Sequence, residues 1–204
     1  MGIEARLTNA RISFASGLWN PSSAVADGIK KFNCDYIVSR DTLVERKDKE
    51  GKWVKSSLKE IQDLITLDAF RGDKKKAEAW FDGLERRQKS VREGDRMTDK
   101  NGDVREGYEG NLYVHATSKT RMPVFRGDRT EVDTEADSPV YSGCYVVARV
   151  QFYANLKSGQ QGLFAGMQGT QFYKSGDAIG GSGSKASADD FEPATDGAAA
   201  GDFA

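Results

Sequence analysis

The chain predicts a mainly β fold, a small closed or nearly closed β-barrel with one helical insertion and an acidic C-terminal tail. Three observations support this prediction. At least five stretches alternate apolar and polar residues, turn-forming residues separate these stretches, and residues 57–84 change to a helical period. A β-sandwich would show the same pattern, so that architecture stays open as the alternative.

The first two alternating stretches lie at residues 3–14 and 31–39. In the first, a polar kink at Thr8-Asn9 separates two apolar series, the second of which ends with Ile12 and Phe14. Glycine, proline and serine predict a loop over residues 17–28. A strand, a turn and another strand are expected over residues 42–55.

The helical insertion begins with a capping-box pattern, Ser57 followed by Glu60. Apolar residues then recur on one helical face, namely Leu58, Ile61, Leu64 and Ile65. A second short helix is expected over residues 73–84. Residues 85–107 are almost wholly polar, and we expect a long mobile loop or hairpin excursion there.

Three further strands are expected at residues 110–119, 143–157 and 162–174. After them, a glycine and serine stretch predicts a flexible linker over residues 176–187. The last segment, residues 188–204, holds five carboxylates, two phenylalanines and no basic residue, so we expect it to be disordered. The predicted organisation is therefore a binding domain at residues 1–175, a linker and an acidic tail.

The charge is divided between these parts. Residues 1–185 contain all 30 basic side chains but only 26 of the 31 acidic ones, which makes the body positive and the tail negative. This asymmetry predicts an anion-binding body with an acidic arm. No apolar run reaches the roughly 18 residues of a membrane span, so no membrane partner is expected.

Catalytic and metal chemistry find little support in the sequence. Cys34 and Cys144 lie in alternating apolar stretches and are predicted to be reduced core residues. His115 is the single histidine, so a zinc ligand set is missing and we expect no cofactor. Nucleophile-elbow and phosphate-loop motifs are absent, which predicts a protein that is not an enzyme.

The outward parity of the later strands carries the candidate binding residues. On residues 143–157 this parity holds Tyr145, Arg149 and Tyr153, and on residues 110–119 it holds Tyr113 and Lys119. Aromatic and basic side chains along one line are typical of a surface on which bases stack while phosphates are neutralised. The adjoining basic loop adds Arg121, Phe125, Arg126 and Arg129.

One segment resembles a known family. Residues 139–181 contain, in order, Tyr141-Ser142-Gly143, Phe152-Tyr153, Gly162, Gly166-Met167-Gln168 and Gly176-Asp177, followed by the acidic tail. With these elements the chain resembles the phage single-stranded DNA-binding proteins of the OB-fold type, the T7-like family. Residues 11–14 and 30–41 resemble it more loosely. Ser39-Arg40 stands where the family has Pro-Lys, and Ala204 follows the phenylalanine that relatives place at or near the end.

The resemblance implies an OB-fold, sequence-independent binding of single-stranded DNA, and a tail that recruits replication and recombination proteins such as a polymerase or helicase. In this tail the candidate partner-binding residues are Asp189, Asp190, Phe191, Asp202 and Phe203. The implied location is the cytoplasm of the infected bacterial host. RNA as a ligand and a homodimer both stay open.

Two other functions are compatible with the sequence. One is a metal-dependent nuclease that uses carboxylates of residues 85–137, although these acids alternate with bases and form no spaced motif. The other is a non-enzymatic phage interaction or virion protein, which would leave the aromatic and basic strip unexplained. Incubation with labelled single-stranded and duplex DNA, with magnesium or manganese, separates the three.

Overall fold

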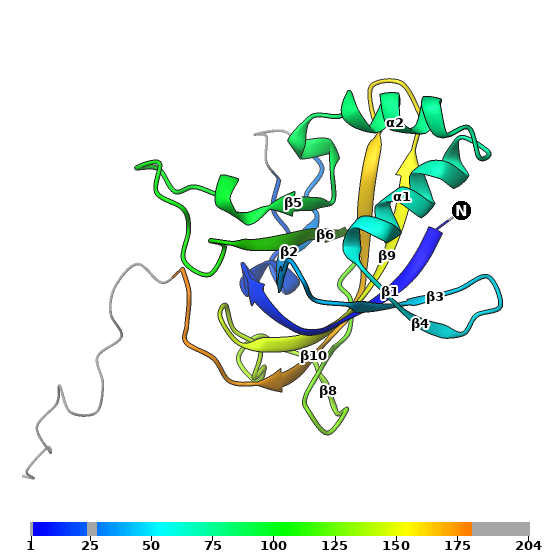
Figure 1. Cartoon of the computed structure of the whole chain (residues 1–204). Coiled ribbons are helices and arrows are strands. Elements are labelled where there is room, and N and C mark those ends of the chain that lie inside the picture. The colour runs from blue at the N-terminus through cyan, green and yellow to red at the C-terminus, as the bar shows by residue number, and fades with distance from the viewer. Residues whose placement is uncertain (1, 24–27, 181–204) are drawn as a thin grey trace, which may run out of the picture.

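A five-stranded ring organises the chain in the computed structural model, which describes residues 2–23 and 28–180 (Figure 1). The ring follows the order β1, β2, β6, β10, β9 and back to β1. Its strands are β1 (Gly2–Ser13), β2 (Phe32–Ser39), β6 (Asn111–Ser118), β9 (Tyr145–Asn155) and β10 (Gly162–Lys174). All neighbours are antiparallel except β6 and β10, which run parallel. The predicted closed barrel is thus present, with the strand order of an OB-like fold.

The kink predicted at Thr8-Asn9 is where β1 changes partners. Asn9 has a φ of 56°, and the pairing of β1 with β9 shifts register between Leu7 and Ala10. Asparagine tolerates this left-handed conformation better than most residues. Before the bulge β1 also pairs with β3, and after it β1 pairs with β2, so one long strand contributes to two parts of the sheet.

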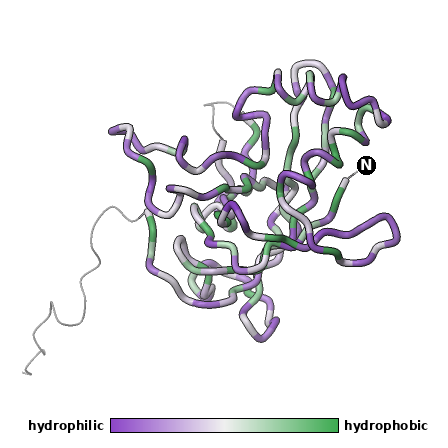
Figure 2. Tube along the Cα trace, viewed as in Figure 1, coloured by the Kyte–Doolittle hydropathy of each residue, from purple (hydrophilic) through white to green (hydrophobic). Residues whose placement is uncertain are grey.

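The inward parity of the ring strands fills the core. Cys34 and Cys144 are both fully buried and unpaired, as the sequence predicted. Tyr36 is also fully buried, and its hydroxyl lies 2.6 Å from the Thr170 hydroxyl on β10. This bond satisfies two polar groups that would otherwise be costly to bury. Figure 2 shows hydrophobic residues concentrated along the barrel strands.

A hairpin and two helices follow β2. The hairpin is formed by β3 (Val44–Lys47) and β4 (Trp53–Ser56), and α1 (Leu58–Ala69) and α2 (Lys74–Asp82) come next. Ser57 caps α1 by accepting a 3.1 Å bond from the Glu60 amide, as predicted. Both helices lie at the end of the barrel near the N-terminus (Figure 1). None of the helices in residues 2–23 and 28–180 is long and apolar enough to cross a membrane.

Residues 85–107 were expected to form a long mobile loop or a hairpin excursion, and the structure shows residues 85–110, here called the arm, as an excursion that packs on the barrel. The arm contains β5 (Val91–Glu93), which pairs with β6, and two short 3₁₀ segments, Arg86–Gln88 and Gly94–Arg96. Its packing is tight, because a Cβ added at Gly94 would lie 2.0 Å from the Tyr108 carbonyl oxygen. Tyr108 is 1% exposed and packs with Ile37, Tyr113 and Ile179 in a second apolar cluster. A small number of buried apolar residues therefore holds this mostly polar arm against the barrel.

The remaining described segments lie beside β10. A short hairpin formed by β7 (Val124–Phe125) and β8 (Glu131–Val132) pairs with the second half of β10. Ile179 is buried and its amide donates a 3.0 Å bond to the Ser142 carbonyl, so the packed body extends beyond residue 175 and into the expected linker. The rest of that linker and the acidic tail lie outside the described residues.

Candidate nucleic-acid interface

The outward face of β9 matches the predicted alternation. Val146, Ala148, Val150 and Phe152 are buried, and Tyr145, Arg149 and Tyr153 lie on the opposite parity. Lys174 Nζ lies 4.6 Å from the ring centroid of Tyr145, whereas Tyr153 packs on Phe164 at 5.8 Å. Eight residues of strand separate the two tyrosines, a distance of about 26 Å. They do not form one continuous stacking platform.

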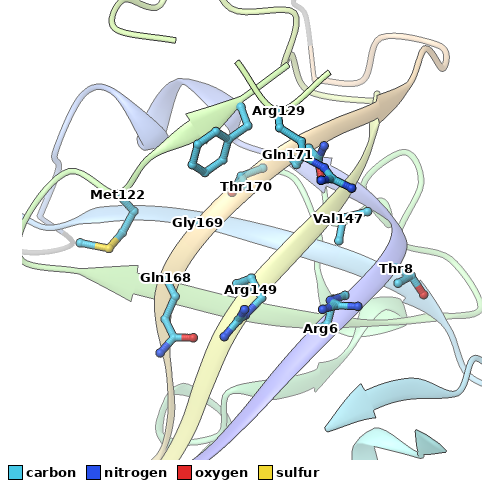
Figure 3. A pocket seen from close by; sticks show the side chains of 11 residues that line it. Arg6, Thr8, Met122, Arg129, Val147, Arg149, Gln168, Gly169, Thr170 and Gln171 are labelled. Carbon is cyan, nitrogen blue, oxygen red and sulfur yellow. The ribbon is translucent and has the colours of Figure 1, made fainter. Parts of the chain in front are cut away.

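Part of the predicted strip lines a hollow on the outer face of β1, β9 and β10, here called the β9–β10 hollow. The structure brings Phe125, Arg129 and Arg149 together there, beside Arg6 and Gln168 (Figure 3). The hollow measures about 900 Å³. Arg6 and Arg149 are direct neighbours, since they face each other across β1 and β9.

Two of the three arginines that line the β9–β10 hollow, Arg6 and Arg149, are already matched by carboxylates, whereas Arg129 forms no ion pair within the described residues. Arg149 donates a 2.8 Å bond to Glu4 and Arg6 donates a 3.0 Å bond to Glu45, and both guanidinium groups also lie over the ring of Trp53. A hydrogen bond from Lys47 is the main cause that holds the pKa of Glu4 below its usual range. Phosphates would have to compete with these acids.

The basic loop is largely engaged with its own backbone. Arg121 lies over the ring of Trp19 at 5.2 Å and donates to the carbonyls of Val132 and Asp133. Arg126 donates a 2.7 Å bond to the Asp137 carbonyl. These contacts fix the loop's shape. Lys119 is exposed and makes no comparable contact with residues 2–23 or 28–180, and it directly follows β6 at the end where β6 faces Phe32.

Tyr113 is a correction, because it was expected on the exposed strip. It does lie on the outward parity of β6, but it is 1% exposed. The arm covers it: Tyr108 packs edge-on against its ring at 5.1 Å, and Arg86 donates a 2.8 Å bond to its hydroxyl. Strand parity predicts on which face of the sheet a side chain lies, but it does not predict whether another segment covers that face. In this arrangement Tyr113 cannot stack on a base.

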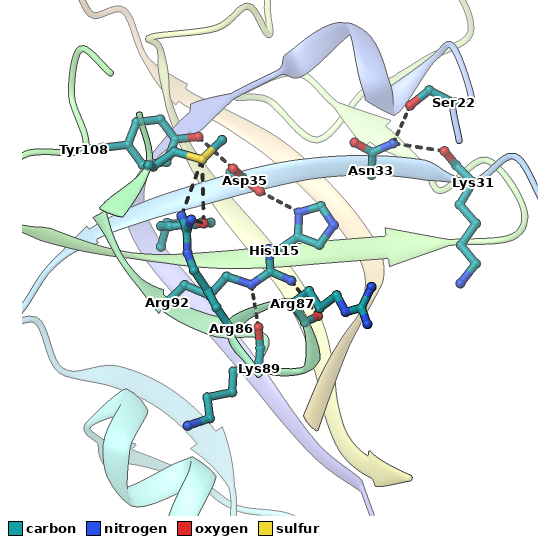
Figure 4. Close-up of polar contacts among 12 residues, drawn as sticks. Ser22, Lys31, Asn33, Asp35, Arg86, Arg87, Lys89, Arg92, Tyr108 and His115 are labelled. Atoms are coloured by element: carbon teal, nitrogen blue, oxygen red, sulfur yellow. Dashed lines mark hydrogen bonds and ion pairs between the residues drawn. The ribbon is translucent and has the colours of Figure 1, made fainter. Parts of the chain in front are cut away.

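A second open surface, here called the β2–β6 groove, lies where the arm leaves the barrel uncovered. It consists of two adjoining hollows of about 510 and 520 Å³ that share Asn33 of β2 and His115 of β6. Lys31 and Thr117 lie at one end, where Lys119 follows, and the arm forms the other wall (Figure 4). The charged arm residues at this wall are Glu85, Arg86, Arg87 and Arg92.

The cations of the β2–β6 groove have few acidic partners. Among the cations that line this groove, Lys31, Arg86 and Arg92 form no ion pair with residues 2–23 or 28–180. Arg87 is the exception, because it pairs with the carboxylate of Glu85 at 2.7 Å. Arg92 instead donates to two backbone carbonyls, those of Lys89 and Arg87 (Figure 4). These bonds orient a guanidinium without neutralising it, so the groove keeps positive charge for an external anion.

An aromatic side chain borders the same groove. Phe14 ends the apolar series of the first strand, but its φ of 57° turns it outward and leaves it 38% exposed. The guanidinium of Arg105 lies 5.5 Å from its ring. A partly exposed ring beside unpaired cations meets the requirements for base stacking beside phosphate binding.

Sequence reasoning missed most of this surface. Asn33 and Lys31 were interpreted only as strand residues, and the arm was expected to be a mobile loop or hairpin excursion whose suggested site was the carboxylate site of the nuclease alternative. The available signal was the run of bases from Arg86 to Arg92, which holds four Lys or Arg side chains and no acid. No group of three or more His, Cys, Asp or Glu side chains suited to a metal ion is present among the described residues.

Fold and groove together define a class. In OB-like barrels the face of the second and third strands is the usual surface for oligonucleotides, and those strands of the ring are here β2 and β6. The basic groove lies on that face. The molecule has the architecture of an OB-like nucleic-acid-binding module.

Comparison with known proteins supports this class. The sequence model of the family described as Enterobacter phage Enc34, ssDNA-binding protein, matches residues 3–204, and the chain belongs to this family of phage single-stranded DNA-binding proteins. Protein p50 of Acyrthosiphon pisum secondary endosymbiont phage 1 is 30% identical over 196 residues, covering 93% of each chain. The predicted family is confirmed, and it is a family of DNA-binding proteins and not of enzymes, which decides against the nuclease alternative.

Solved structures show the same fold at low sequence identity. The single-stranded DNA-binding protein of bacteriophage Enc34 in complex with single-stranded DNA has a TM-score of 0.57 and 16% identity, covering 87% of this chain and 89% of that one. The C-terminally truncated form of the Enc34 protein has a TM-score of 0.56 and 15% identity, covering 86% and 87%.

Proposed function

We propose that the chain binds single-stranded DNA without regard to sequence, in the β2–β6 groove. The observation that carries this proposal is the set of groove cations without carboxylate partners, on the face that OB-like barrels use. The β9–β10 hollow is the weaker candidate, because Arg6 and Arg149 are already paired with acids. Phosphate contacts confer affinity but carry no sequence information, which fits binding without sequence preference.

In this proposal Lys31, Arg86 and Arg92 neutralise phosphates and Phe14 stacks on a base. Lys119 extends the basic groove beyond Thr117. The other predicted contacts, Tyr145 and Tyr153 among them, lie on the β9 face and would contact DNA only if the strand also passed there. Family membership and the OB-like fold support a role in phage replication, recombination and repair, in the cytoplasm of the infected bacterial host.

Neutralising substitutions test the location of the DNA. Fluorescence anisotropy with a labelled oligo(dT) would compare Lys31→Gln with Lys55→Gln, a control at an exposed lysine on β4. Each lost phosphate contact should lower the slope of log affinity against log salt by about 0.7. We expect this change for Lys31→Gln and none for Lys55→Gln.

A third variant addresses the competing surface. Arg129 lines the β9–β10 hollow with a φ of 73°, and glutamine keeps the same backbone strain while it removes the charge. Arg129→Gln should leave both the affinity and the salt slope unchanged. If Arg129→Gln weakens binding and Lys31→Gln does not, the DNA lies in the β9–β10 hollow and the proposed location is wrong.

The acidic tail supports a second part of the proposal, the recruitment of replication and recombination proteins such as a polymerase or helicase. Its two phenylalanines, Phe191 and Phe203, stand among aspartates and can combine apolar burial with a charge contact on a basic partner. Pull-down with the full chain and with Phe203→Ala tests this. Capture should weaken in the variant while affinity for oligo(dT) is unchanged.

A further inference from the structure

A carboxylate lies directly beneath the β2–β6 groove. Asp35 is on the outward parity of β2 and is only 2% exposed. One carboxylate oxygen lies 2.7 Å from His115 Nδ1, and the other accepts a 2.7 Å bond from the Tyr108 hydroxyl of the arm (Figure 4). A buried carboxylate is costly unless it is paired and hydrogen-bonded. These two bonds, one on each oxygen, meet that requirement.

The bond between Asp35 and Nδ1 also orients the ring of His115. Because Nδ1 faces Asp35, the opposite ring nitrogen, Nε2, faces away from the carboxylate. The side chain is 32% exposed and lines both hollows of the groove. A carboxylate on Nδ1 keeps the proton on that nitrogen, so the neutral ring presents an acceptor at Nε2 and a protonated ring presents a donor. Protonation therefore adds a positive charge and an N–H group on the groove side.

Charges of both signs face this imidazole. From β2 and the residue before it come Asp35 and Lys31, and from the arm come Glu85, Arg86, Arg87 and Arg92. The cations oppose a further positive charge on the ring, and the acids favour it. The phosphates of a bound strand would add negative charge at the open side of the ring, where Nε2 lies. Binding would then shift the balance toward the protonated ring.

We propose that His115 contacts a phosphate of the bound strand through Nε2, that Asp35 and Tyr108 position its ring, and that strand binding is coupled to uptake of one proton at Nε2. The inference rests on the proposed function and assigns a specific role within it. Because the protonated form binds more tightly, affinity rises as pH falls. Linkage of a single proton limits the change to about tenfold per pH unit.

The first test observes the ring itself. His115 is the only histidine in the chain, so one imidazole Hε1 signal reports its titration by NMR. The titration is recorded for the full chain alone and with saturating oligo(dT). We expect the midpoint to be higher in the complex. A midpoint that is unchanged or lower in the complex overturns the proposal, and no variant is needed.

The second test measures affinity against pH, between about pH 6 and 8, where imidazole usually titrates. The wild type should bind oligo(dT) more tightly at low pH, and His115→Gln should lose most of this dependence, while its slope of log affinity against log salt falls by no more than the value of about 0.7 expected for one phosphate contact. The control Lys55→Gln should match the wild type. Oligo(dA) should show the same dependence, since a phosphate is the contact. A difference between the two oligomers would indicate a base contact instead.

The positioning role has its own readout. Asp35→Asn retains the shape of the side chain but removes the charge, and we expect a changed ¹⁵N shift at Nδ1 and a smaller rise of affinity at low pH.

Equal pH dependence in wild type and His115→Gln would refute the inference alone. A wild type that bound no single strand at any pH would refute the proposed function and the inference with it.

Discussion

Replacing Tyr108 by Phe removes a single oxygen atom from one of the contacts that tie the arm to the barrel. The Tyr108 hydroxyl is buried and donates a 2.7 Å bond to Asp35, while the ring packs on Tyr113. Burial is the main cause that raises the pKa of this hydroxyl, so it remains a donor through the working pH range. The substitution leaves one oxygen of a buried carboxylate without its donor.

The expected cost follows from that geometry. Leaving a buried polar group unsatisfied costs about 1–3 kcal/mol, and a charged acceptor belongs to the upper part of this range. We expect the free energy of unfolding to fall by about 2 kcal/mol, which corresponds to about 4–8 °C in Tm for a chain of this size. Urea denaturation followed by circular dichroism measures the change. Tyr173→Phe is the matched control, because Tyr173 is 57% exposed.

A double-mutant cycle shows whether the cost belongs to this bond. In the Asp35→Asn background the charge is absent, so Tyr108→Phe should cost less than in the wild type, with a coupling of at least about 0.5 kcal/mol. Additive costs in the two backgrounds would refute the reasoning. A urea midpoint for Tyr108→Phe equal to that of Tyr173→Phe would refute it as well, and would mean that the other contacts of the arm, such as the pairing of β5 with β6, hold it without this bond.

Two further predictions concern other parts of the chain. Burial raises the pKa of the Cys34 and Cys144 thiols, so neither should react with a thiol reagent at pH 8 until the protein is unfolded, and fast labelling of the folded chain would contradict their place in the core. Deleting residues 186–204 removes five carboxylates from a positive body, so affinity for oligo(dT) should rise, most of all at low salt; an unchanged affinity at every salt concentration would show that the tail does not compete with DNA.

Local signals predicted the ring well. The register shift at Asn9 and the cap at Ser57 each depend on residues close in sequence, and alternation placed the buried side of β9 correctly. These features follow from backbone geometry and short-range hydrogen bonds. The fold class could therefore be predicted from these patterns, and the family from the resemblance of residues 139–181.

The candidate site was harder to predict because coverage of a strand face depends on distant residues. Tyr113 has the parity of an exposed residue, yet Tyr108 and Ile179 cover it. Phe14 has the parity of a core residue, yet a left-handed backbone turns it outward. The pairing of Arg149 with Glu4 joins residues 145 positions apart. The apolar and polar periodicity of a single strand predicts none of these three features.

Lysine acetylation footprinting tests the location of the DNA most directly. The full chain, with and without saturating oligo(dT), is acetylated briefly, and the extent of modification at each lysine is read by mass spectrometry. The proposed location predicts strong protection of Lys31 and Lys119 at the β2–β6 groove, with Lys55 and Lys75 unchanged. Protection confined to Lys174, beside Tyr145 on the β9 face, with Lys31 fully reactive, would contradict it.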